Sequence, residues 1–185
     1  MTVLLILLVV IALAVVWVIG MYNGLVRARN EVGNAWSQID VQLNRRHDLI
    51  PNLVETVKGY MTHERETLEA VVKARQQAVQ VTGNLEDKAR VENALSQTLR
   101  TLFAVSENYP QLKANENFLA LQEELASTEN KIAFSRQYYN DSVLNLNNKI
   151  QMFPTSIFAN MFNFKQAQFF QVESAEVRKP VAVKF

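Results

Sequence analysis

The residue types most capable of chemistry lie together in "RRHDLIP", where Arg45, Arg46, His47 and Asp48 precede Pro51. A histidine beside an aspartate could form an acid–base pair. The surrounding apolar spacing is helical, however, and adjacent side chains on a helix project about 100° apart, so His47 and Asp48 would not face one cleft. We therefore predict no catalytic residue in this motif.

Metal binding is also not expected at this motif. The chain has two histidines, His47 and His63, and no cysteine. Zinc sites need three or four ligands at short spacings, and the sequence holds no HExxH pattern. The neighbours His63 and Glu64, and the paired Glu123 and Glu124, are more typical of solvated charged faces. The sequence thus predicts no metal and no cofactor.

An architectural role explains the motif better. Arg46 falls where the apolar pattern expects a hydrophobic residue, so its head should reach water or find carboxylate partners, which we expect from the third predicted helix. Pro51 removes one helical hydrogen bond and frees a carbonyl one turn earlier, which a side chain could satisfy. A ligand site around Arg45–Asp48, with Asn140 and Asp141 as possible partners, remains the alternative.

Ladders of apolar side chains build the helices that carry this motif. Two interleaved seven-residue ladders run through residues 25–60, one of them interrupted by Arg46, and such a seam suits coiled-coil-like packing. Their members are Leu25, Val32, Ile39, Leu53 and Tyr60 in one ladder and Trp36, Leu43, Ile50 and Val57 in the other. A spacing of three and four residues continues to Val79, which predicts one helix up to the turn at residues 82–84.

Two further helices follow in the prediction. Asn84 could cap a second helix that runs to about Asn108, where Pro110 disfavours helix at the preceding residue. The third helix, from about Asn115 to Met152, is roughly 57 Å long and must lie along the first helix to bury its apolar stripe. We therefore predict an all-α fold, in which a transmembrane helix precedes an elongated up-down-up bundle of long antiparallel helices.

The first helix begins as a membrane anchor. Residues 3–21 form an uncharged run of 19 residues, roughly 29 Å long, which is enough to span a bilayer core. A cleaved secretory signal is the alternative, because "ALA" within the run resembles a cleavage site, but no basic region precedes it. Trp17 and Tyr22 fall at the expected interface, and Arg27 and Arg29 follow, which predicts a cytoplasmic domain with the N-terminus outside.

Two features are candidates for contacts between subunits. Gly20 and Gly24 lie four residues apart, the spacing at which membrane helices approach closely. Seven of the ten phenylalanines lie at or after Phe153, and Phe153, Phe158 and Phe162 fall along one side of a short helix. These rings could close the end of their own bundle, insert at the membrane interface or contact neighbouring subunits.

The totals exclude other classes of protein. The 19 basic and 18 acidic residues nearly cancel, so no net field attracts nucleic acid. Without cysteine the chain forms no disulfide and offers no thiol nucleophile. The expected organisation is an anchor at 1–24, a helical bundle at 25–152 and an aromatic-rich segment at 153–185.

The sequence resembles the LemA family over nearly the whole chain. The matching stretches are "YNGLV" (22–26), "IDVQLNRRHDLIPNLVETVKGYMTHE" (39–64), "YPQLKANENFLALQEELASTENKIAFSRQYYND" (109–141) and "FPTSIFANMF" (153–162). The resemblance implies a bacterial membrane protein with one N-terminal span and a helical bundle, and no established enzymatic activity, cofactor or substrate. Some relatives are connected to membrane organisation, such as a magnetosome-associated member, and others to a membrane metalloprotease or to surface stress.

Two functions are compatible with these observations. The preferred one is a non-catalytic, single-pass scaffold of the bacterial inner membrane that self-assembles and organises or shapes membrane. Its expected partners are membrane lipids, copies of itself and other membrane proteins, and not nucleic acid. The alternative is a ligand sensor or enzyme with its site at Arg45–Asp48. A closed ion-pair network at that cluster would favour the scaffold, and a pocket holding a small molecule would favour the alternative.

Overall fold

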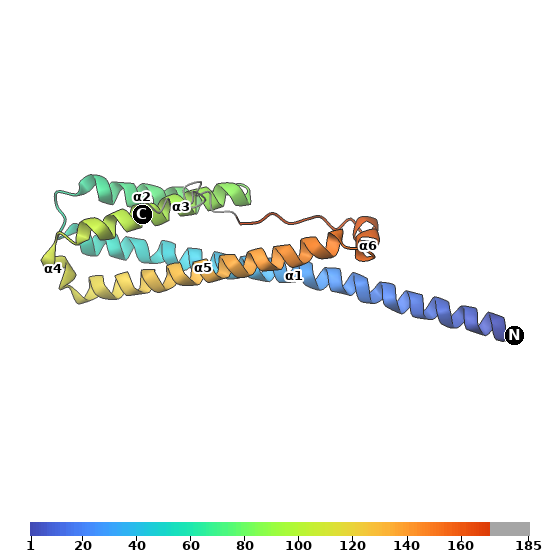
Figure 1. Cartoon of the computed structure of the whole chain (residues 1–185). Coiled ribbons are helices and arrows are strands. Elements are labelled where there is room, and N and C mark those ends of the chain that lie inside the picture. Colours follow the sequence, from blue (N-terminus) through green and yellow to red (C-terminus); the bar gives the residue numbers. More distant parts are fainter. Residues whose placement is uncertain (171–185) are drawn as a thin grey trace, which may run out of the picture. The chain divides into compact units, whose positions relative to one another are not determined.

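The computed structural model describes residues 1–170, which are helical throughout their regular structure and contain no strand (Figure 1). The predicted all-α fold class is confirmed. The helices are α1 (Thr2–Lys58), α2 (Arg65–Gln80), α3 (Leu85–Ser106), α4 (Pro110–Lys113), α5 (Glu116–Gln151) and α6 (Thr155–Met161). The last part of the predicted aromatic segment, residues 171–185, lies outside the described residues.

The structure differs from the prediction at the end of the first helix. It ends at Lys58 and α2 begins at Arg65, so residues 59–64 form a turn where the apolar spacing predicts continuous helix. Gly59 is a poor helix former. Met61, which is 1% exposed, holds the turn against the core. The helical bundle therefore contains four long segments in up-down-up-down order rather than three.

The chain forms two compact units, and both α1 and α5 contribute to each of them. The second unit contains Gln42–Lys131. In it, the later part of α1, then α2, α3 and the early part of α5 alternate in direction, as short connections between helices require (Figure 1). Their apolar stripes meet in one core, which includes Ile50, Leu53, Val57, Val71, Leu95, Leu99, Leu102, Phe118 and Leu125. This unit holds the "RRHDLIP" motif.

Local signals place the helix ends of the second unit. The side chain of Asn84 accepts a hydrogen bond of 2.9 Å from the backbone N–H of Asp87, which confirms the predicted cap of α3. Pro110 begins α4, where a missing N–H is tolerated because no helical partner is needed there. Sequence signals within a few residues of each other therefore set these boundaries.

The first unit consists of Met1–Val41 and Ile132–Phe169. Its core joins α1, the later part of α5 and α6 through Leu25, Ala28, Leu146, Ile150 and Ala159. The N-terminal part of α1 extends past this core (Figure 1). Within residues 1–170, α1 is the one helix long and apolar enough to cross a membrane, with a mean hydropathy of 3.3 over its most apolar 18 residues.

Candidate functional site

Arg46 is the centre of the polar cluster in the second unit. It is fully buried, with 0% of its surface exposed. Its Nη1 donates hydrogen bonds of 2.7 Å to Ser96 Oγ and 2.7 Å to Glu129, and its Nη2 forms an ion pair with Glu92. Arg46 lies on α1, Glu92 and Ser96 lie on α3, and Glu129 lies on α5. One guanidinium therefore ties three helices together.

Glu92 is a buried carboxylate, with 2% of its surface exposed. His47 Nε2 lies 3.0 Å from Glu92 Oε1, and Arg46 Nη2 forms its ion pair with the other carboxylate oxygen, Oε2. Burial alone would raise the pKa of Glu92, but the contact with His47 and the positive charge of Arg46 outweigh it and hold that pKa below its ordinary value. Glu92 is therefore charged at neutral pH, as a buried arginine requires.

A second arginine compensates for Pro51. A proline inside a helix leaves the carbonyl four residues earlier without its helical partner, and here that carbonyl belongs to His47. Arg75 Nε, from α2, donates a hydrogen bond of 2.7 Å to this carbonyl oxygen. Arg75 thus links α2 to α1.

The remaining residues of the predicted motif lie away from the buried cluster. Arg45 is at the surface, where its Nη2 lies 2.5 Å from Glu124 Oε1 and the two side chains are 51% and 40% exposed. Asp48 is exposed. Asn140 and Asp141 belong to the first unit, whereas Arg46 finds its carboxylates on α3 and α5 of the second. The structure thus brings Arg46 and His47 together with residues that the motif does not contain.

Glu92 was missed by the sequence reasoning, although the sequence holds a signal for it. Glu92, Leu95, Leu99 and Leu102 follow a spacing of three, four and three residues, so Glu92 occupies an apolar position of α3 as Arg46 does on α1. Opposite charges at apolar positions of two helices indicate a buried pair.

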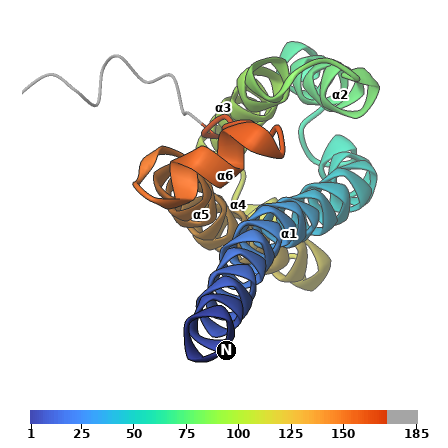
Figure 2. The same cartoon turned by 90° about the vertical axis from the view of Figure 1, so that its right-hand side faces the viewer.

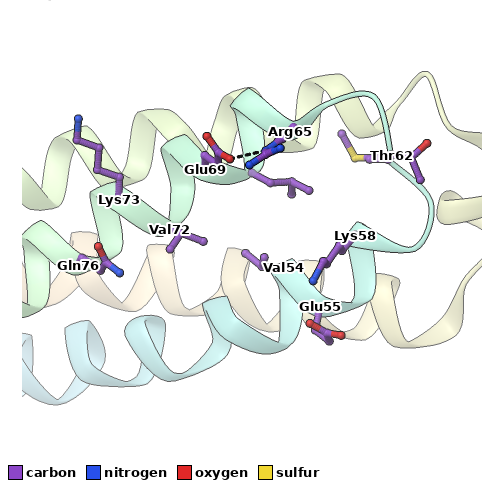
Figure 3. A pocket seen from close by; sticks show the side chains of 11 residues that line it. Val54, Glu55, Lys58, Thr62, Arg65, Glu69, Val72, Lys73 and Gln76 are labelled. Atoms are coloured by element: carbon purple, nitrogen blue, oxygen red, sulfur yellow. Dashed lines mark hydrogen bonds and ion pairs between the residues drawn. The ribbon is translucent and has the colours of Figure 1, made fainter.

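Two hollows lie on the second unit. One, of about 220 Å³, borders the cluster and is lined by residues including Arg46, Ser96, Arg100 and Glu129. The other, of about 700 Å³, lies between the end of α1 and α2 and shares no lining residue with the first. Figure 3 shows this larger hollow, with Val54 on α1 and Val72 on α2 at its apolar floor and the pair Arg65–Glu69 beside it. Among residues 1–170, no group of three or more carboxylate or histidine side chains could hold a metal ion.

The predicted interfacial residues gather in the first unit. Trp17 makes an edge-to-face contact with Phe158 at 6.3 Å between ring centroids, and Tyr22 makes one with Phe162 at 4.9 Å. The guanidinium of Arg29 lies 5.3 Å from the centroid of a further ring, that of Phe164. Aromatic side chains of the C-terminal segment therefore reach the end of the apolar run of α1.

Other candidates for subunit contact have open surroundings. A Cβ placed on Gly20 or Gly24 would meet no atom within 4 Å. Phe153 is 80% exposed, and Arg27 is exposed as well. Contacts of these residues with other subunits stay a prediction.

Comparison with known proteins agrees with this architecture. The sequence model of the LemA family matches residues 35–185. The chain is 26% identical to Protein LemA of Metamycoplasma hominis over 158 residues, which are 85% of this chain and 72% of that protein. It is 23% identical to Magnetosome protein MamQ 1 and to Magnetosome protein MamQ 2 of Paramagnetospirillum magneticum over 179 residues, covering 83% of this chain and 66% of each relative. A match over most of its length shows that the chain belongs to the LemA family.

Proposed function

We propose that this protein is a non-catalytic scaffold, anchored in the bacterial inner membrane by α1, whose helical bundle organises or shapes membrane or membrane-protein partners. The proposal rests on the contacts that the Arg46 guanidinium makes. Both of its terminal nitrogens are engaged with Glu92, Glu129 and Ser96, so the cluster that most resembles a catalytic site holds helices together. Relatives named as magnetosome proteins support a structural role.

The position of the anchor supports a bundle on the cytoplasmic side. The apolar part of α1 is followed by Arg27 and Arg29, and basic residues flanking a span favour the cytoplasmic side. Anchoring confines every copy to one bilayer with its bundle at the same level. This confinement raises the effective concentration, so that modest lateral contacts are enough for self-assembly.

Crosslinking and sizing test the self-assembly. Lysine-reactive crosslinking in isolated membranes should yield ladders of this chain, and extraction in mild detergent should yield a particle several times heavier than one 21.1 kDa chain. A chain without residues 1–24 at the same mean concentration should crosslink far less, because it lacks the confinement. A monomer in detergent that also fails to crosslink in membranes would refute self-assembly, and proteins that co-purify with the particle would identify partners.

One observation favours a second candidate function, a ligand sensor. The hollow of about 220 Å³ reaches Arg46, whose Nε has no hydrogen-bond partner among residues 1–170. This volume is smaller than the roughly 300–1,000 Å³ of most small-molecule sites, which favours the scaffold. Arg100 lines this hollow. If small anions raise the melting temperature of the wild type and not that of an Arg100→Ala variant, the result would favour the sensor function over the scaffold.

A further inference from the structure

The short helix α6 lies across the end of the membrane helix. Within the first unit, Figure 1 shows α1 from the side and α6 nearly end-on, and Figure 2 shows the reverse, so the two axes cross steeply. The contacts of Phe158 with Trp17 and of Phe162 with Tyr22 hold α6 at this place. A helix that crosses a membrane span steeply lies roughly in the plane of the membrane.

The level of this crossing is the edge of the apolar run. Trp17 belongs to the run at residues 3–21, and Tyr22 is the next residue after it. Five residues of helix cover about 7.5 Å along the axis, which matches the depth of an interfacial layer. Helix α6 is thus placed where bilayer hydrocarbon meets the headgroups.

The two faces of α6 have different surroundings. Ala159 is fully buried against the core of the first unit. On α6 itself, Ile157 and Met161 are four residues apart and are 54% and 62% exposed, and Phe153, in the turn before the helix, is 80% exposed. These three exposed side chains form the apolar stripe of this segment, and within residues 1–170 no other side chain covers them enough to bury them, which favours a contact with a further apolar surface.

Charge around the stripe favours a lipid surface as that occupant. Interfacial helices usually combine an apolar face with basic residues, and among residues 153–170 the one basic side chain is Lys165. The first unit also contains Arg27 and Arg29 on α1 and Lys149 on α5, and the guanidinium of Arg29 lies 5.3 Å from the centroid of the Phe164 ring. Residues 17–30 and 145–165 contain these four basic side chains and no acidic one, and Glu31 is the next residue of α1.

We propose that Phe153, Ile157 and Met161 insert into the boundary between headgroups and acyl chains of the membrane that α1 crosses. The basic residues around them then face anionic headgroups. This inference rests on the proposed anchoring and adds a second membrane contact to it. A single span leaves a protein free to rotate about the helix axis, whereas a second contact beside the span sets one face of the first unit against the bilayer.

Depth-dependent quenching of a fluorescent label tests the proposal, and the absence of native cysteine makes single-site labelling possible. The full-length variants Ile157→Cys, Val16→Cys and Asp141→Cys are labelled and reconstituted into vesicles of phosphatidylethanolamine and phosphatidylglycerol. Some of these lipids carry bromine near the headgroup end of the acyl chain, and iodide serves as the aqueous quencher. Val16 lies in the apolar run, and Asp141 is an exposed residue of α5 in the same unit.

The label at Ile157 should be quenched by brominated lipid several-fold more than the label at Asp141. Quenching of the Ile157 label by iodide alone, with the Val16 label still quenched by lipid, would overturn the interfacial contact and leave the anchor standing. A Val16 label that lipid does not quench would overturn the anchor and the contact together. An Ile157 label shielded from both quenchers, together with disulfide-linked dimers of the unlabelled Ile157→Cys variant under oxidising conditions, would assign the stripe to a second copy and overturn the lipid contact.

Discussion

Replacing Arg46 with alanine should lower the free energy of unfolding by about 3–5 kcal/mol at pH 7, the range for breaking a buried ion pair. The largest part comes from Glu92, which is 2% exposed and would lose its main counter-charge. The free-energy cost of leaving the Glu92 carboxylate without Arg46 has an upper bound, because Glu92 can take up a proton rather than stay buried as an unpaired charge. From an ordinary pKa of 4.5, protonation at pH 7 costs about 3.4 kcal/mol, at about 1.4 kcal/mol per pH unit. Lost packing of the buried arginine stem supplies the remainder.

The same bound makes the loss depend on pH. At pH 5, protonating Glu92 costs only about 0.7 kcal/mol, so the effect of Arg46→Ala should shrink by about 2–3 kcal/mol between pH 7 and pH 5. The wild type should change little there through Glu92. The folded-state pKa of Glu92 is lowered. Its contribution to the free energy of unfolding is therefore fully present above the unfolded-state pKa of 4.5 and is lost as the pH falls through the folded-state pKa.

Urea unfolding of the full chain in mild detergent, followed by circular dichroism at 222 nm, measures these differences. Arg45→Ala is the matched control, because its pair with Glu124 is exposed and contributes only about 0–1 kcal/mol. Adding Glu92→Gln to Arg46→Ala should recover part of the loss at pH 7, since no buried charge is left unpaired. Equal effects of the two arginine substitutions, or a loss for Arg46→Ala that is the same at both pH values, would refute this account of the cluster.

Three further predictions concern helix ends, the anchor and orientation. Asn84→Ala should lower the free energy of unfolding by about 1 kcal/mol, because it removes the cap of α3; no change in the urea midpoint would contradict this. Removal of residues 1–24 should give a soluble helical protein, and a far-ultraviolet dichroism spectrum dominated by strand or coil would argue against independent folding of the bundle. A Gln76→Cys variant should react with an impermeant thiol reagent only after the inner membrane is disrupted, and labelling in cells with an intact inner membrane would reverse the proposed orientation.

Much of the helical architecture follows from local sequence. The apolar ladders predict long helices, Asn84 marks the start of one helix, Pro110 marks the end of that helix, and the run at residues 3–21 predicts a membrane span. These features depend on side chains within one or two turns of each other, and their energies do not require the rest of the fold. The position of Arg46 on a ladder likewise indicates a buried charge with carboxylate partners.

The turn at residues 59–64 was not predictable in the same way. A single glycine such as Gly59 is tolerated inside many helices, at a cost of about 1 kcal/mol. Burial of Met61 in the core of the second unit outweighs the continuation of the helix. Met61 is buried only once α2 has folded back against α1, so tertiary packing determines where the first helix ends.

Spacing along the chain alone determined which face of each helix is apolar, and it predicted the position of Arg46 on that face; Glu92 follows the same spacing, although the sequence reasoning missed it. Only the tertiary structure decided that these two residues meet, and that Phe158 and Phe162 reach Trp17 and Tyr22. The physical reason is that a periodic stripe packs almost equally well in several registers along its neighbour. The choice among those registers depends on contacts between residues far apart in sequence, and these contacts brought Ala159 of α6 into one core with Leu25 of α1 and Ile150 of α5.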